Sequence, residues 1–159
     1  MIDMQVSRTM ARTAVAATVA TASALALSTP ASANPTTYAT QTIYTAACPD
    51  AQQSIDIYGT TITAKTTVNK AMGAQCTAGT VLNQAVYIIN YQGTVLTSQG
   101  AADTVGDLGY TYSATNVLSY TLPRGSRVEL QSVTITNGVN SRTHVLRIYA
   151  SGRIESLVL

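Results

Sequence analysis

Apolar and polar residues alternate with a period of two along most of the chain after residue 34. Thr, Val, Ile and Tyr dominate these stretches, and Gly or Asn interrupts them about every ten residues, which is typical of an all-β domain. The clearest alternation is "SIDIY" at 54–58, where Ile55 and Ile57 face one side and Asp56 and Tyr58 the other. No segment has the apolar period of an amphipathic helix.

This pattern predicts about eight or nine short strands, a number typical of sandwich folds. The predicted strands and hairpins cover residues 36–46, 54–58, 60–68, 80–100, 110–122, 127–136 and 142–159. Residues 69–79 and 101–109 are predicted as loops, the first with one helical turn as an alternative. We therefore expect an antiparallel β-sandwich of immunoglobulin-like or jelly-roll type, with a closed β-barrel as the alternative fold.

Three local predictions refine this fold. The run Ala85–Ile89 is apolar on both faces, which indicates a central strand that is covered on each side. The alternation slips near Gln131-Ser132, which suggests a β-bulge. In the closing hairpin, a loop at 151–153 would place Tyr149 opposite Glu155, with Arg147 on the diagonal.

The first 33 residues have the pattern of a secretory signal peptide. Arg8 and Arg12 precede an apolar run, Ala14–Leu27, and Ala31-Ser32-Ala33 supplies small residues before a cleavage point after Ala33. The apolar run is too short to span a hydrocarbon core of about 30 Å. The sequence thus predicts a bacterial-type signal and one secreted, extracellular domain over 34–159, with no membrane span after cleavage.

Residues 34–159 contain two cysteines, Cys48 and Cys76. In an oxidising compartment they are expected to form one disulfide, which would stabilise the fold by about 3–4 kcal/mol through loop closure. Two cysteines and one distant histidine cannot supply the four ligands of a structural zinc site, so no metal is expected.

Charged residues are distributed unequally between the earlier and the later part of residues 34–159. The seven basic and six acidic residues of 34–159 nearly balance, which argues against general nucleic-acid binding. All arginines of this region nevertheless lie between 124 and 153. We take the outward-facing Arg147 and Tyr149 of the closing hairpin, with the nearby Arg142 and Arg153, as the candidate binding residues, since aromatic residues are enriched at interfaces.

Candidate catalytic residues are few. His144 is the only histidine, and Ser141, three positions away, would point to the opposite face of a strand. Asp103 and Asp107 are the only close acidic pair, and their Gly-rich surroundings favour a role in turns. No nucleophile elbow, phosphate-binding loop or dinucleotide fingerprint is present, so no cofactor is expected.

These observations predict a non-catalytic, secreted binding module, either extracellular or associated with the cell wall. It would act on an unknown protein or glycan partner, as a small inhibitor or antimicrobial factor would, through loops on a rigid scaffold. Two alternatives stay open: a small secreted hydrolase that uses His144, and a structural β subunit that self-associates through strand pairing.

Overall fold

The computed structural model describes residues 33–159, and these residues form ten strands and one short 3₁₀ helix. The predicted signal peptide over 1–33 lies outside the described residues, apart from Ala33. The elements are β1 (Thr37–Ile43), β2 (Ala51–Tyr58), β3 (Thr61–Asn69), η1 (Lys70–Met72), β4 (Val81–Ile89), β5 (Val95–Thr104), β6 (Thr111–Ser119), β7 (Arg127–Thr136), β8 (Val139–Asn140), β9 (His144–Tyr149) and β10 (Ile154–Val158).

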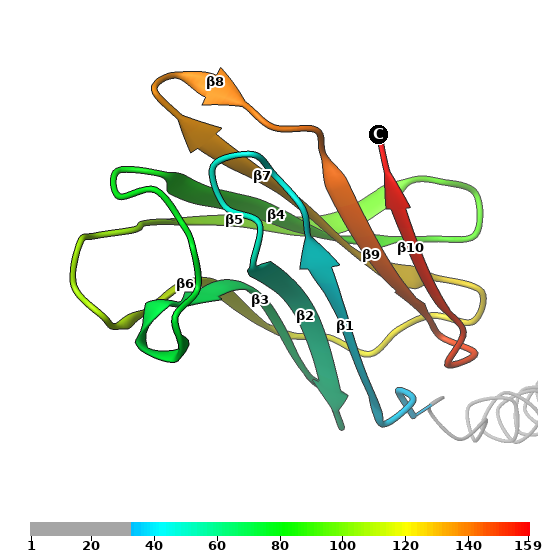
Figure 1. Ribbon diagram of the computed structural model, residues 1–159. Helices are drawn as coiled ribbons and strands as arrows, with labels where there is room; N and C mark the ends of the chain where they lie inside the picture. The colour runs from blue at the N-terminus through cyan, green and yellow to red at the C-terminus, as the bar shows by residue number, and fades with distance from the viewer. Residues whose placement is uncertain (1–32) are drawn as a thin grey trace, which may run out of the picture. The chain divides into compact units, whose positions relative to one another are not determined.

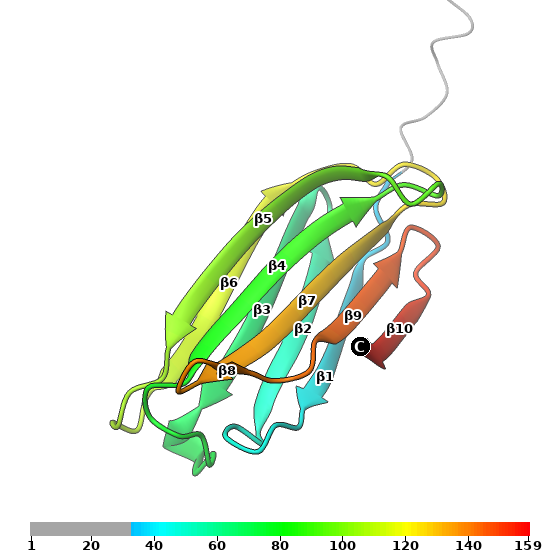
Figure 2. The same ribbon diagram turned by 90° about the horizontal axis from the view of Figure 1, so that it is seen from above.

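The strands form two antiparallel sheets that pack face to face (Figures 1 and 2). One sheet has the order β1-β2-β3-β6, and the other has the order β10-β9-β7-β4-β5 with β8 paired to β7. The chain changes sheet after β3, after β5 and after β6. The predicted β-sandwich is confirmed, and the sheets do not close into the alternative barrel.

The central strand predicted from 85–89 is β4, which lies between β7 and β5. The expected cover on both faces is wrong, because only the inner face packs against the other sheet and Ala85 and Tyr87 on the outer face are half-buried. The predicted loop at 101–109 begins later than expected, because β5 continues to Thr104 and pairs with the start of β4. Asp103 therefore lies in a strand, and its carboxylate accepts the backbone N–H of Ser113 in β6 at 2.7 Å. This contact joins the edge strands of the two sheets on one side of the sandwich.

The predicted register of the last hairpin is wrong by two residues. Arg147 lies directly opposite Glu155, and Tyr149 is on the diagonal. The loop is 150–152, closed by hydrogen bonds from Gly152 N to Tyr149 O and from Tyr149 N to Arg153 O, both at 2.8 Å. Gly152 takes the left-handed conformation, with φ of +86°, that the third position of this loop requires. A shift of two residues keeps every side chain on its predicted face.

The predicted bulge near Gln131-Ser132 is also wrong. β7 pairs without interruption with β4 on one side and with β9 on the other. The alternation seemed to slip because Ser132 is polar but faces inward, where it is only 1% exposed. The alternation of apolar and polar residue types is interrupted at Ser132, but the strand pairing is not.

Two apolar clusters fill the space between the sheets. The larger one contains residues of both sheets, such as Ile55, Ile88 and Leu146. The smaller one, at the other end of the strands, includes Ile43, Leu82 and both cysteines. The predicted Cys48–Cys76 disulfide is confirmed, and it ties the segment after β1 to the segment after η1.

A layer of polar side chains separates these two clusters. Gln53, for example, lies between Ala51 of the smaller cluster and Ile55 of the larger one along β2. We call these inward-facing residues the polar layer; they are Gln41, Gln53, Thr66, Gln84, Asn116, Ser132 and His144. Most of their backbone positions align in register across neighbouring strands, as in the pairs Gln53–Thr66 and Ser132–His144, whereas Asn116 pairs with Ala64 and lies one inward position away from Thr66.

Hydrogen bonds join the two sheets through this layer. Gln53 Nε2 donates to Ser132 Oγ at 2.7 Å and to the carbonyl of His144 at 3.0 Å. Thr66 Oγ1 lies 2.6 Å from Ser132 Oγ and donates to Gln84 Oε1 at 2.7 Å. Because buried polar groups are costly unless they are paired, this network favours one alignment of the sheets over all others.

Candidate functional site

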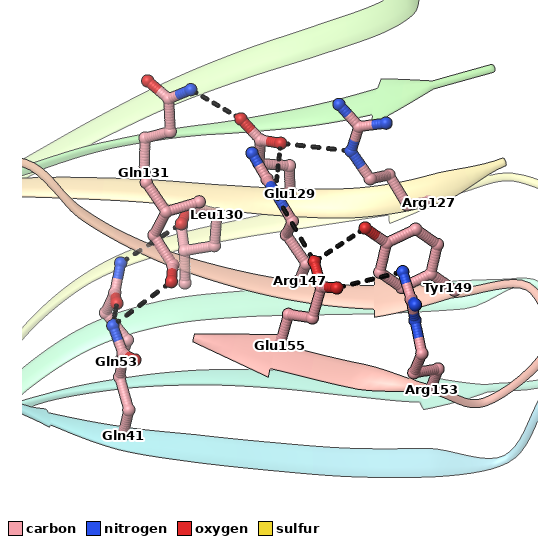
Figure 3. Close-up of polar contacts among 11 residues, drawn as sticks. Gln41, Gln53, Arg127, Glu129, Leu130, Gln131, Arg147, Tyr149, Arg153 and Glu155 are labelled. Carbon is pink, nitrogen blue, oxygen red and sulfur yellow. Dashed lines mark hydrogen bonds and ion pairs between the residues drawn. The ribbon is translucent and has the colours of Figure 1, made fainter. Parts of the chain in front are cut away.

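The outer face of the six-stranded sheet carries a cluster of charged residues centred on Glu129 (Figure 3). The Glu129 side chain is only 5% exposed, although it points away from the apolar core. Its carboxylate accepts hydrogen bonds from Arg147 Nε at 2.7 Å, from Arg127 Nε at 3.2 Å and from Gln131 Nε2 at 2.7 Å. We call this set, extended by the residues described next, the Glu129 cluster.

β9 and β10 extend the cluster toward the edge of the sheet. Arg147 reaches Glu155 at 3.6 Å in addition to Glu129, because Arg147 lies between the two carboxylates in the sheet register. The hydroxyl of Tyr149 donates to Glu155 at 2.7 Å. Arg153 ion-pairs with Glu155 at 3.0 Å and lies over the Tyr149 ring, 4.1 Å from its centroid.

The cluster shifts the ionisation of its members. Burial alone would raise the pKa of Glu129, but hydrogen bonds from Gln131, Arg147 and Arg127 outweigh burial and lower that pKa. The hydrogen bond from Tyr149 is the main cause that lowers the pKa of Glu155. Burial opposes the charge of Arg147, yet its bonds to Glu129 raise its pKa further. All three groups are therefore charged at neutral pH.

Three of the four predicted binding residues belong to this cluster: Arg147, Tyr149 and Arg153. Arg147 makes two ion pairs and its side chain is 23% exposed, whereas the side chain of Arg153 is 61% exposed. Arg142 lies elsewhere, in the segment between β8 and β9, where it lines a separate cleft with His144. The structure therefore divides the predicted set between two surfaces.

Sequence reasoning missed Glu129 and the polar layer. Glu129 is the only acidic residue in β7. Two of its hydrogen-bond donors, Arg127 and Gln131, lie two positions before and after it in the sequence and therefore on the same face of the strand. Arg147, the third partner, comes from β9 and is found only through the strand pairing. The signal for the polar layer was a single polar residue at an inward position in several strands, and we interpreted one such residue, Ser132, as a bulge.

The catalytic candidates do not come together in the described part of the chain. Ser141 Oγ donates to the carbonyl of Arg142 and accepts the backbone N–H of Thr134. No hydrogen bond joins the His144 ring to a serine or a carboxylate within residues 33–159, and burial lowers the pKa of this ring. Within the same residues, no group of three or more His, Cys, Asp or Glu side chains has the arrangement of a metal site.

None of the known protein-family models, curated proteins and solved structures with which the chain was compared matches it. In the region from residue 33 to the last residue, no helix has both the length and the apolar character needed to cross a membrane.

Proposed function

We propose that this protein is a secreted binding module that contacts a protein or glycan partner through the outer face of its six-stranded sheet. The observation that carries the proposal is the stack of Arg153 on Tyr149, held in place by Glu155. The Cys48–Cys76 disulfide supports the extracellular part of the proposal, because such bonds persist in oxidising compartments.

Preorganisation is the physical reason for this choice of surface. An exposed arginine normally loses rotamer freedom when it binds, at a cost of about 0.5–1.5 kcal/mol per ordered side chain. Arg153 is already restrained by a ring on one side and a carboxylate on the other, although most of its side chain is exposed. Tyr and Arg are also the residues most often found at the energetic centres of interfaces.

The test is capture of a partner from culture medium and from the cell walls of the producing organism by the immobilised protein. We expect Tyr149→Ala and Arg153→Ala each to weaken capture at least about tenfold, the usual effect of removing an interface anchor. Tyr38→Ala and Arg124→Ala are matched controls, because both residues are exposed and neither belongs to the Glu129 cluster. Equal capture by all four variants would contradict the proposed contact surface.

A second candidate function is self-association through β10, and one observation favours it. Ile154 and Val158 point toward the other sheet but stay 47% and 51% exposed, since β10 is the last strand of its sheet. The backbone hydrogen bonds between Arg153 and Tyr149 and between Leu159 and Thr143 fix which residues of β10 bond to the neighbouring strand. The backbone groups of Ile154, Ser156 and Val158 therefore point to the free edge.

Such an edge can pair with the same strand of a second copy. An antiparallel pair centred on Ser156 would place Ile154 of one copy against Val158 of the other. Sedimentation would then show a mass that rises with concentration, and Val158→Lys would abolish the rise, as lysine does at natural sheet edges. A wild-type protein that stays monomeric at high concentration would rule this candidate out.

A further inference from the structure

The polar layer ends at a side chain whose hydrogen-bonding capacity is unused. His144 is only 5% exposed, and its ring has no hydrogen-bond partner among residues 33–159. In the same residues, the one fully buried side-chain nitrogen or oxygen without a partner is Asn69 Oδ1. The nitrogen atoms of the His144 ring are therefore not fully buried, and the ring lines a surface cleft through which solvent reaches them.

The cleft has a volume of about 520 Å³, within the range of small-molecule sites. It lies between the segment after β1 and the start of β9, and Val158 at the end of β10 forms part of its wall. Its lining, which is mostly apolar, consists of Tyr44, Thr45, Ala46, Ser141, Arg142, His144 and Val158. Arg142 is exposed and forms no ion pair with any residue that the structure describes.

The charged side chain that lines the cleft favours an anion. Arg142 contributes a permanent positive charge, and no carboxylate side chain is part of the lining. The arginines of the Glu129 cluster differ in this respect, because each of them already binds a carboxylate of the same chain. The apolar atoms of Val158 and the ring of Tyr44 cannot solvate a bare inorganic ion, but they can pack against a hydrocarbon body.

We propose that this cleft binds an organic carboxylate with a short apolar body. The guanidinium of Arg142 pairs with the carboxylate, and the ring N–H of His144 donates a second hydrogen bond to it. The apolar body lies against Val158 and Tyr44. This site is separate from the outer face of the proposed function, and either proposal can fail without the other.

The test uses the ring resonances of His144, which are unambiguous because the chain has one histidine. Hexanoate is titrated into the full domain at neutral pH, with hexanol as the uncharged analogue and inorganic phosphate as the anion without an apolar body. We expect hexanoate to shift these resonances saturably and to bind at least about tenfold more tightly than either analogue, since both the charge and the chain are needed. A dipeptide with a free C-terminal carboxylate, tested beside hexanoate, distinguishes a chain terminus from a free acid as the source.

Arg142→Gln should weaken hexanoate at least about tenfold, as expected for loss of a charged hydrogen bond. Its temperature of unfolding should not change, because Arg142 is exposed and forms no ion pair within residues 33–159. Arg124→Gln, at the exposed turn before β7, is the matched control and should bind as the wild type does. The proposal is overturned if hexanoate leaves the His144 resonances unmoved, if phosphate or hexanol binds equally well, or if the two variants behave alike.

Discussion

The polar layer and the Glu129 cluster are two hydrogen-bonded networks, one between the sheets and one on the outer face of the six-stranded sheet, and they use different chemistry. Inside the sandwich the partners are neutral amides and hydroxyls, and the network joins one sheet to the other. On the outer face the partners are charged, and the network joins neighbouring strands of one sheet. β7 contributes to both, through Ser132 inward and Glu129 outward.

The difference follows from what each surface can solvate. An ion pair between the sheets would lose the hydration of two charges, whereas an amide–hydroxyl pair loses much less. On the outer face, Arg127 and Arg147 keep 23% of their side chains exposed and therefore part of their hydration. We infer that the inner network holds the alignment of the sheets, and that the outer one shapes a surface. Four predictions test this division.

Gln53→Leu should have the largest effect. It removes the amide that bonds across the sandwich to Ser132 and to the carbonyl of His144, and leaves those buried acceptors with fewer donors. We expect a loss of about 2–3 kcal/mol in the free energy of unfolding, measured by urea denaturation. Gln52→Leu, at the adjacent exposed position of β2, is the control and should cost little. An equal loss in both variants would show that the layer does not join the sheets.

Glu129→Gln should have the next largest effect. The substitution keeps the size of the side chain but leaves Arg127 and Arg147 with one fewer negative charge. Because both arginines are partly hydrated, we expect a loss of about 1–2 kcal/mol in the free energy of unfolding, less than for a fully buried pair. Glu129→Asp keeps the charge, so recovery of part of the stability would separate charge from shape. A loss larger than that of Gln53→Leu would contradict the ranking of the two networks.

Acid should weaken the two networks in different pH ranges. The pKa of Glu129 is lowered, so its contribution is complete above its ordinary pKa of 4.5 and is lost as the pH falls through its folded value. Burial lowers the pKa of His144, so the contribution of the neutral ring is lost as the pH falls below its ordinary pKa of 6.5.

Urea midpoints at pH 7.5, 5.5 and 3.5 separate these two ranges. Glu129→Gln should leave the fall between pH 7.5 and 5.5 unchanged and reduce the fall between pH 5.5 and 3.5, whereas His144→Gln should reduce the fall that begins between pH 7.5 and 5.5. If Glu129→Gln leaves the lower fall as large as in the wild type, the carboxylate does not stabilise the folded state through its charge.

Glu155→Gln should have the smallest effect on unfolding, because its partners are close to solvent and screened by salt. We expect its change in stability to be smaller than that of Glu129→Gln and to disappear in 1 M sodium chloride. Fluorescence of the tyrosines would still report a change, since the substitution removes the carboxylate that positions Tyr149 and Arg153. If the loss in the free energy of unfolding did not depend on salt, Glu155 would act like a buried charge and the prediction would be wrong.

Much of this fold could be predicted from local pattern. Ile55 and Ile57 alternate with Asp56 and Tyr58, and this is how β2 presents them. Cys48 and Cys76 had only each other as partners, so their disulfide needed no structure. The register of the last hairpin was harder, because Ser151 and Gly152 fit two neighbouring loops. The left-handed conformation of Gly152 selects the loop that begins one residue earlier.

The candidate site was less predictable. Arg147, Tyr149 and Arg153 stood out by residue type, but their partner Glu129 is 18 residues away from Arg147 along the chain and is brought there by the β7–β9 pairing. Arg142 belonged to the same stretch of sequence and yet lies on another surface. A residue's neighbours in sequence decide which face of a strand it takes, and strand order decides what it meets there.

The sequence by itself therefore determined the β class, the inward and outward faces of the strands and the disulfide. Each of these depends on the period-two geometry of a strand or on the count of a residue type. Only the tertiary structure decided that single polar residues from separate strands form one layer, and that Glu129 is satisfied by three donors. Those facts depend on which strands pair and how the two sheets align, and such long-range contacts leave no period in the sequence.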